Sequence, residues 1–150
     1  MADGRSHARA AFLVLAAGGA GWALGQVPGP VLGGLALGWM VTPDIDLPGT
    51  TYEEERVYRL RLGCLPIGLL LGLAWEWYWF PYARIVPHRS PWSHLPGLGT
   101  AARLLYLALP YLVYGWAFGF PWWDWGVVLQ VWAGMAVQDT VHLVLDAVRF

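Results

Sequence analysis

Five apolar stretches, separated by short polar segments, make up most of the chain. They cover residues 8–24, 31–41, 60–80, 101–120 and 126–148. A membrane-spanning helix needs about 20 predominantly apolar residues, and the second stretch is the one that falls well short of this. The pattern therefore predicts an all-α membrane protein, with a single integral membrane domain over residues 1–150.

The arginines distinguish between two ways of threading these stretches through a bilayer. Lysine is absent, so arginine supplies all nine basic side chains. If all five stretches cross, the arginines divide almost evenly between the two faces. If residues 60–80 enter and leave by the same face, every arginine lies on one side. Because basic residues concentrate on the cytoplasmic side, we expect four transmembrane helices plus one re-entrant or interfacial segment at about residues 60–80, with both termini cytoplasmic.

The composition of residues 60–80 agrees with a shallow position in the membrane. Pro66 and Gly68 interrupt its first half, and Glu76 lies among three tryptophans and a tyrosine. A carboxylate at the bilayer centre costs about 2.5–3.5 kcal/mol, and much less at an aromatic-rich interface. A plain tilted fifth helix is the alternative.

Composition and charge narrow the class of protein. Hydrophobic residues make up 57% of the chain and charged residues 13%, which is too apolar for an ordinary soluble domain. The net charge of -1 offers no basic surface for nucleic acid. Cys64 is the single cysteine, so it forms no intrachain disulfide. We expect the lipid bilayer as a partner, a homo-oligomer or a larger membrane complex as further assemblies, and no nucleic acid.

Under this topology the ionisable side chains gather near the cytoplasmic face. They are all four histidines and four aspartates: His7, Asp44, Asp46, His88, His94, Asp139, His142 and Asp146. The last three lie on one stripe of a helix, because their spacings are three and four. A hydrogen-bonded packing cluster is the alternative for this stripe, and a helix-capping turn is the alternative for Asp44. In an extended segment, alternation would place Asp44 and Asp46 on the same side.

Imidazole and carboxylate groups together are ligands of zinc, manganese or iron. We expect a divalent transition metal, zinc first, as one or two ions, with a bridging carboxylate from Asp44 or Asp46. The expected metal ligands are His7, Asp44, Asp46, His88, His94, His142 and Asp146. Arg89 is placed to clamp a phosphate or carboxylate, and Asp46 or Asp139 to act as general base. Ser90 and Ser93 are expected to cap the next helix or to orient the histidines.

These motifs resemble a family of small bacterial membrane proteins described as metal-binding, related to LexA-regulated, membrane-bound metal-dependent hydrolases. The resemblance rests on residues 4–7, 43–46, 81–82, 88–90 and 93–94, on Gly99-Thr100 with Arg103 and Tyr106, and on His142 with Asp146. More distantly, the scatter of histidines and aspartates is similar to zinc-dependent phospholipase C and related nucleases. The resemblance implies a multi-pass protein of the bacterial inner (cytoplasmic) membrane.

Three functions compete at this point. The first is a metal-dependent hydrolase acting on a phosphoester or lipid headgroup at the cytoplasmic face. The second is a non-catalytic, metal-stabilised membrane protein or a small accessory subunit of a membrane complex. The third is a metal or proton transporter, which would need polar residues continuing to the far side, where Gln130 and Gln138 are almost the only ones.

Overall fold

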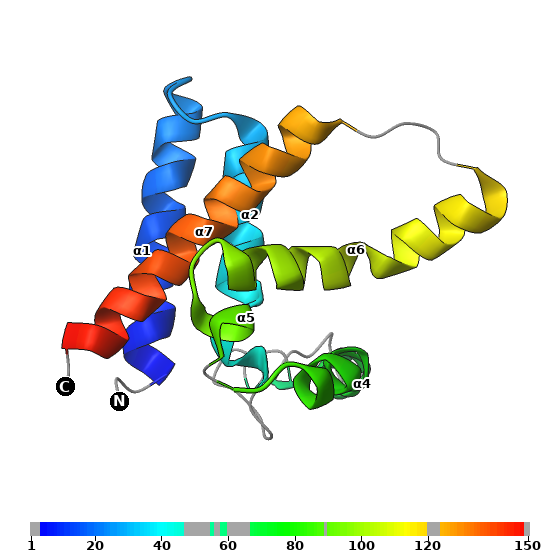
Figure 1. Cartoon of the computed structure of the whole chain (residues 1–150). Helices are drawn as coiled ribbons and strands as arrows, with labels where there is room; N and C mark the ends of the chain where they lie inside the picture. The colour runs from blue at the N-terminus through cyan, green and yellow to red at the C-terminus, as the bar shows by residue number, and fades with distance from the viewer. Residues whose placement is uncertain are drawn as a thin grey trace.

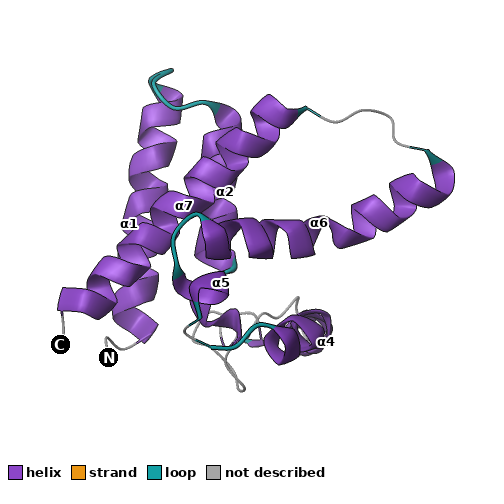
Figure 2. Ribbon diagram, in the orientation of Figure 1, coloured by secondary structure: helices purple, strands orange, loops and turns teal. Residues whose placement is uncertain are grey.

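A computed structural model describes residues 4–46, 55, 58–59, 67–88, 90–119 and 124–148, and these form helices joined by short turns. In chain order the elements are α1 (Gly4–Ala23), α2 (Gly29–Met40), the 3-10 helix η1 (Pro43–Asp46), α4 (Ile67–Ile85), α5 (Pro91–His94), α6 (Leu98–Phe118) and α7 (Trp125–Val148). Figure 2 shows helices and loops, with no strand in the described part of the chain. The expected all-α class is confirmed.

Four of the five apolar stretches coincide with single helices, α1, α2, α6 and α7. The helix in the remaining stretch begins at Ile67 and continues through Pro81 to Ile85. Pro66 lies outside the described residues. Proline is tolerated poorly inside a helix because it removes one backbone hydrogen bond, yet both α4 and α6 contain one, at Pro81 and Pro110.

Two of the described helices, α6 and α7, are long and apolar enough to cross a membrane by length and composition, and α2 is apolar but shorter. The four transmembrane helices expected from the sequence are therefore not supported by this criterion. Long core helices of soluble proteins and signal sequences can pass the same test. Membrane insertion and the re-entrant course of residues 60–80 stay predictions.

α1, α2 and α7 pack together, and α6 leaves this group at a steep angle (Figure 1). The start of α1 and the end of α7 lie near each other at one end of the group (Figure 1). Glycines allow α2 and α7 to approach closely: a Cβ at Gly34 would lie 2.0 Å from the Val131 carbonyl oxygen, and one at Gly134 would lie 2.2 Å from that of Val31. Small residues at such a contact let two helix backbones touch directly.

A second packing unit joins α4 to α6 and η1. Its buried members are Val41, Ile45, Trp79, Tyr82 and Met135. Tyr78 donates a hydrogen bond to the Tyr106 carbonyl oxygen (2.8 Å), and Tyr106 donates one to that of Tyr78 (2.6 Å). These reciprocal bonds hold α4 beside α6, and thereby fix the start of the loop that carries His88.

The glycine contact predicts a sharp difference between two adjacent positions of α2. Gly34→Ala should lower the free energy of unfolding by about 1–3 kcal/mol, because the new methyl group meets the α7 backbone, which cannot move aside as a side chain would. Gly33→Ala is the matched control: a Cβ there meets nothing within 4 Å, so the change should be neutral or stabilise by up to about 1 kcal/mol. Thermal unfolding of both variants in the same detergent measures the difference. Equal unfolding midpoints would contradict the close α2–α7 contact.

Candidate metal centre

Six of the seven expected ligand side chains meet at one place. They come from segments far apart in the sequence: His7 from α1, Asp44 from η1, His88 from the turn after α4, His94 from α5, and His142 and Asp146 from α7. The side chain of the seventh, Asp46, lies outside the described part of the structure, as does Arg89. Both stay predictions.

The inner group of ligands lies between α1, η1 and α7. Ligand atoms of His7, Asp44 and His142 all lie within 4.8 Å of one another. Asp146 adds a second carboxylate: its Oδ1 is 3.4 Å from His7 Nε2, and its Oδ2 is 3.6 Å from His142 Nε2. The rings of His7 and His142 pack edge to face with centroids 4.1 Å apart. The inner group thus holds two imidazoles and one carboxylate, and a second carboxylate adjoins both imidazoles.

The outer group shares Asp44 with the inner one. Ligand atoms of Asp44, His88 and His94 also lie within 4.8 Å of one another. The two oxygens of Asp44 face opposite ways: Oδ1 is 3.5 Å from His94 Nε2, and Oδ2 is 3.5 Å from His142 Nε2. A carboxylate disposed in this manner can bridge two cations, as expected of Asp44 or Asp46.

The separations fit a metal better than they fit hydrogen bonds. Four ligands at about 2.0–2.2 Å around a tetrahedral zinc lie roughly 3.3–3.6 Å from one another. The four nitrogen-to-oxygen distances above span 3.4–3.6 Å, whereas good hydrogen bonds of this type are about 2.7–3.2 Å long. His142 Nε2 is buried and has no hydrogen-bond partner among the described residues. A metal ion would satisfy this atom.

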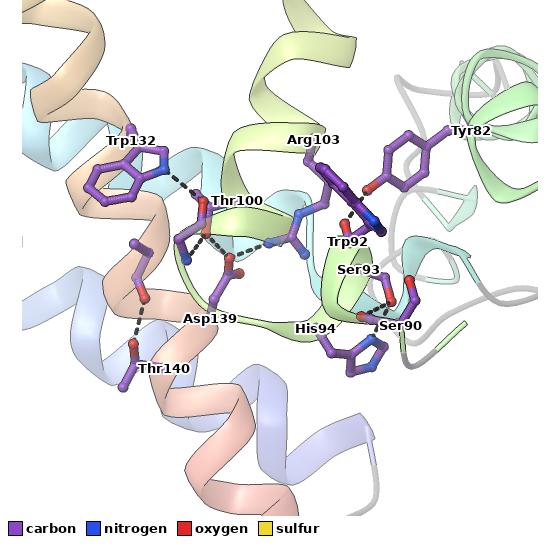
Figure 3. Close-up of polar contacts among 12 residues, drawn as sticks. Tyr82, Ser90, Trp92, Ser93, His94, Thr100, Arg103, Trp132, Asp139 and Thr140 are labelled. Carbon is purple, nitrogen blue, oxygen red and sulfur yellow. Dashed lines mark hydrogen bonds and ion pairs between the residues drawn. The ribbon is translucent and has the colours of Figure 1, made fainter. Parts of the chain in front are cut away.

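Ser93 orients one of the histidines. Its Oγ lies 2.8 Å from His94 Nδ1 and 3.2 Å from the Ser90 carbonyl oxygen, as Figure 3 shows. Because the hydroxyl donates to that carbonyl, it accepts the proton of Nδ1. His94 Nε2 then carries the lone pair and faces Asp44, which is the tautomer that a metal requires. The expectation that Ser93 orients a histidine matches this geometry.

Asp44 is held in its ionised form. Burial by itself raises the pKa of the Asp44 carboxyl, but the imidazoles of His142 and His94 that face its two oxygens outweigh burial, and hold that pKa well below its usual range. An ionised carboxylate between imidazoles is the form that binds a cation.

Asp139 has a different kind of partner from Asp146, the other acidic residue of α7. It is 2% exposed and forms a buried ion pair with Arg103, which is fully buried (0% exposed). Thr100 donates a second hydrogen bond to the same carboxylate oxygen and accepts one from the Gly97 backbone N–H (Figure 3). The carboxylate is therefore engaged in packing α6 against α7, as the alternative of a hydrogen-bonded cluster expects.

The structure corrects one local expectation. Residues 43–46 form a 3-10 turn, η1, and not an extended segment. Successive residues of a 3-10 helix are rotated by about 120°, so the backbone does not direct Asp44 and Asp46 to the same side.

Gln138, which lies one turn before His142, has a structural role that its sequence context did not indicate. Its amide nitrogen donates to the carbonyl oxygens of Ala11 (3.0 Å) and Leu35 (3.2 Å) and so ties α7 to both α1 and α2. Gln138 also lines a small cavity with His7, Thr42 and His142. The available signal was Gly38, which leaves room for the Gln138 side chain: a Cβ there would lie 2.8 Å from Gln138 Cβ.

Comparison with known proteins agrees with a metal-binding role. Residues 72–142 match a family described as "uncharacterized metal-binding protein (DUF2227)". The matched range contains His88, His94 and His142. No curated protein and no solved structure matches the chain. The comparison supports a metal-binding protein, and leaves the expected relation to the LexA-regulated hydrolases as a prediction.

The geometry around His94 predicts that replacing Ser93 weakens metal binding, whereas replacing the nearby Ser90 does not. Ser93→Ala should weaken metal binding by about 10–100-fold, because His94 loses the partner that sets its tautomer and ring orientation. Ser90→Ala is the matched control, since the Ser90 hydroxyl has no hydrogen-bond partner among the described residues; it should bind metal as the parent does. Competition with a chromogenic chelator measures both affinities. A loss of equal size in both variants would show that the turn, and not the Ser93 hydroxyl, supports the ligand.

Proposed function

We propose that this protein is a membrane-embedded, metal-dependent hydrolase that acts on a phosphoester or lipid headgroup at the cytoplasmic face. The observation that carries the proposal is the position of Asp44 between two histidine groups, with one oxygen toward His94 and the other toward His142. A divalent transition metal, zinc first with manganese or iron as alternatives, would supply Lewis acidity and an activated water there. Such chemistry suits the cleavage of a phosphoester.

The residues of the chain have separate roles in this proposal. His7, His88, His94, His142, Asp44 and Asp146 hold the metal. Arg89 binds the phosphate, because a guanidinium matches two phosphate oxygens at once. Asp46 is the remaining candidate for the general base, since the carboxylate of Asp139 is buried and paired with Arg103.

The membrane location draws support from the outer surfaces of α6 and α7. Large apolar side chains on α6 are strongly exposed, Trp116 at 87% and Phe118 at 75%. Exposed apolar surface of this extent on a helix long enough to span a bilayer favours lipid contact. We place the protein in the bacterial inner membrane as a multi-pass protein, with both termini and the metal centre cytoplasmic.

A specific observation also favours the non-catalytic alternative. The inner group offers two histidines and Asp44, and the adjoining Asp146 would bring the number of ligands to the four that a closed structural zinc site uses. A metal there would join α1 and α7 without any reaction, in a metal-stabilised protein or a small accessory subunit of a membrane complex.

The first experiment tests the reaction. Detergent-purified protein should contain a transition metal by elemental analysis, and should hydrolyse bis(4-nitrophenyl) phosphate or a phospholipid in mixed micelles. Removal of the metal with a chelator should abolish the rate, and re-addition should restore it. Asp44→Asn should lower both metal content and rate by at least about tenfold, because it removes a charged ligand shared by both groups.

Thr140→Ala is the matched control on α7, because its exposed hydroxyl bonds only to the Ala136 carbonyl oxygen of the same helix among the described residues. It should keep both metal and rate. Protein without transition metal would overturn both functions. Metal that raises the unfolding midpoint, with no hydrolysis of either substrate, would overturn the hydrolase and favour the structural role.

The second experiment tests the orientation in the membrane. In a Cys64→Ser background, Trp92→Cys should react with a membrane-impermeant thiol reagent only after permeabilisation, because residue 92 belongs to the cytoplasmic centre. Leu24→Cys, exposed at the opposite end of α1, should react in intact cells. Labelling of Trp92→Cys from outside would contradict the proposed topology.

A further inference from the structure

The two halves of the metal centre differ in how many ligands they offer. The inner half has His7, Asp44 and His142, whose ligand atoms lie within 4.8 Å of one another. Asp146 adjoins it and can supply a fourth ligand, because its Oδ1 is 3.4 Å from His7 Nε2 and its Oδ2 is 3.6 Å from His142 Nε2. The outer half has Asp44, His88 and His94 from the described residues. Structural zinc sites close with four protein ligands, whereas catalytic sites use three and keep one position for water or substrate.

The halves also differ in burial and in the rigidity of their supports. His7 and His142 are 8% and 7% exposed and stand on α1 and α7, long helices of the packed group. His88 and His94 are half-buried, and come from a turn and from the four-residue helix α5. Ligands already held in place lose less conformational entropy on binding, which raises affinity.

Charge reinforces this difference. Among the described residues, Asp44 and the adjoining Asp146 face the inner half, and Asp44 is the one carboxylate of the outer half. A divalent cation in the inner half would neutralise Asp44 before a second cation arrives, and would repel that cation across a few ångströms. The second ion therefore binds more weakly than the first.

We propose that the two half-sites bind metal with unequal affinity: the inner half keeps its ion as part of the fold, and the outer half takes up an exchangeable ion on which hydrolysis depends. The catalytic role of the outer ion rests on the proposed function, whereas the unequal affinity of the two half-sites does not. This difference in affinity makes the activity sensitive to the free metal concentration through His88 and His94, while the inner ion stays bound.

Stepwise titration of the metal-free full chain tests the inequality. Zn²⁺ in competition with a chromogenic chelator should reveal two sites whose dissociation constants differ by at least about tenfold, a difference of 1.4 kcal/mol. Co²⁺ gives a second readout, because its visible spectrum should change at both the first and the second equivalent. One class of two equal sites, or a single site, would overturn the inference.

Two variants assign the classes. His88→Ala should remove the weaker class alone, with the tight class and the unfolding midpoint unchanged. Asp146→Asn, at a position 24% exposed, should weaken the tight class by at least about tenfold and lower the midpoint of the metal-loaded protein. Asp146→Asn serves here instead of His7→Ala because a partly exposed carboxylate is less needed for folding. Loss of the tight class in His88→Ala would overturn the assignment.

Activity is then measured at one and at two equivalents of Zn²⁺. Hydrolysis that appears only with the second equivalent supports the outer ion as the catalytic one, and full activity at one equivalent overturns that role. No hydrolysis at either occupancy, with two unequal binding steps intact, would reject the hydrolase and leave the inequality of the half-sites standing. The two failures are thus distinguishable.

Discussion

The direct backbone contact between α2 and α7 sets the position of the metal centre. Gly34 faces Val131 and Gly134, and one turn later Gly38 faces Met135 and Gln138. The two helices therefore advance in step, and the next turn brings Thr42 to the cavity that His142 lines. Asp44 follows immediately in η1, where it reaches both His142 and His94. A side chain at Gly34 or Gly38 of α2 would push η1 away from α7 and separate these ligands.

α7 carries two carboxylates, Asp139 and Asp146, whose charges are compensated by different kinds of partner. An ionised carboxylate removed from water needs a compensating partner. Asp139 has a permanent one in the Arg103 guanidinium and a hydroxyl donor in Thr100. Two turns later the partners of Asp146 within the described part of the chain are imidazoles, those of His7 and His142. Arginine is charged at any ordinary pH, whereas imidazole is neutral in the form that binds metal. The first arrangement fixes α6 against α7, and the second leaves room for a cation.

The outer ligands depend on the second packing unit, which joins α4 to α6 and η1, and on α5, which contacts both α6 and η1. The tyrosine pair joins α4 to α6, and Gly99 lets α6 approach α5 so closely that a Cβ would lie 2.5 Å from the Ser93 carbonyl oxygen. This contact places His94 at the start of α6, while the chain from α4 delivers His88. The centre thus lies where two packing units meet, so metal binding and the relative position of these units are linked.

The sequence alone determined the helical class, the approximate bounds of four helices and the residue types of the site. Apolar runs of helical length predict helices from the local sequence alone, and histidine with aspartate in so apolar a chain has few uses besides binding. It also named Ser90 and Ser93 as residues that cap the next helix or orient the histidines, and the structure gives the contact with His94 to Ser93.

The tertiary structure decided which carboxylate does what. Asp139 and Asp146 are equivalent on the helix stripe. The packing of α6 against α7 pairs Asp139, and not Asp146, with Arg103. Asp44 and Asp46 are equivalent by sequence pattern, but the 3-10 helix η1 does not direct them to the same side of the backbone. Gln138 gained its role from carbonyls on α1 and α2, which no local pattern reveals. Spacing along a chain specifies which side chains share a face, but their partners come from other helices, and the packing of those helices determines the pairing.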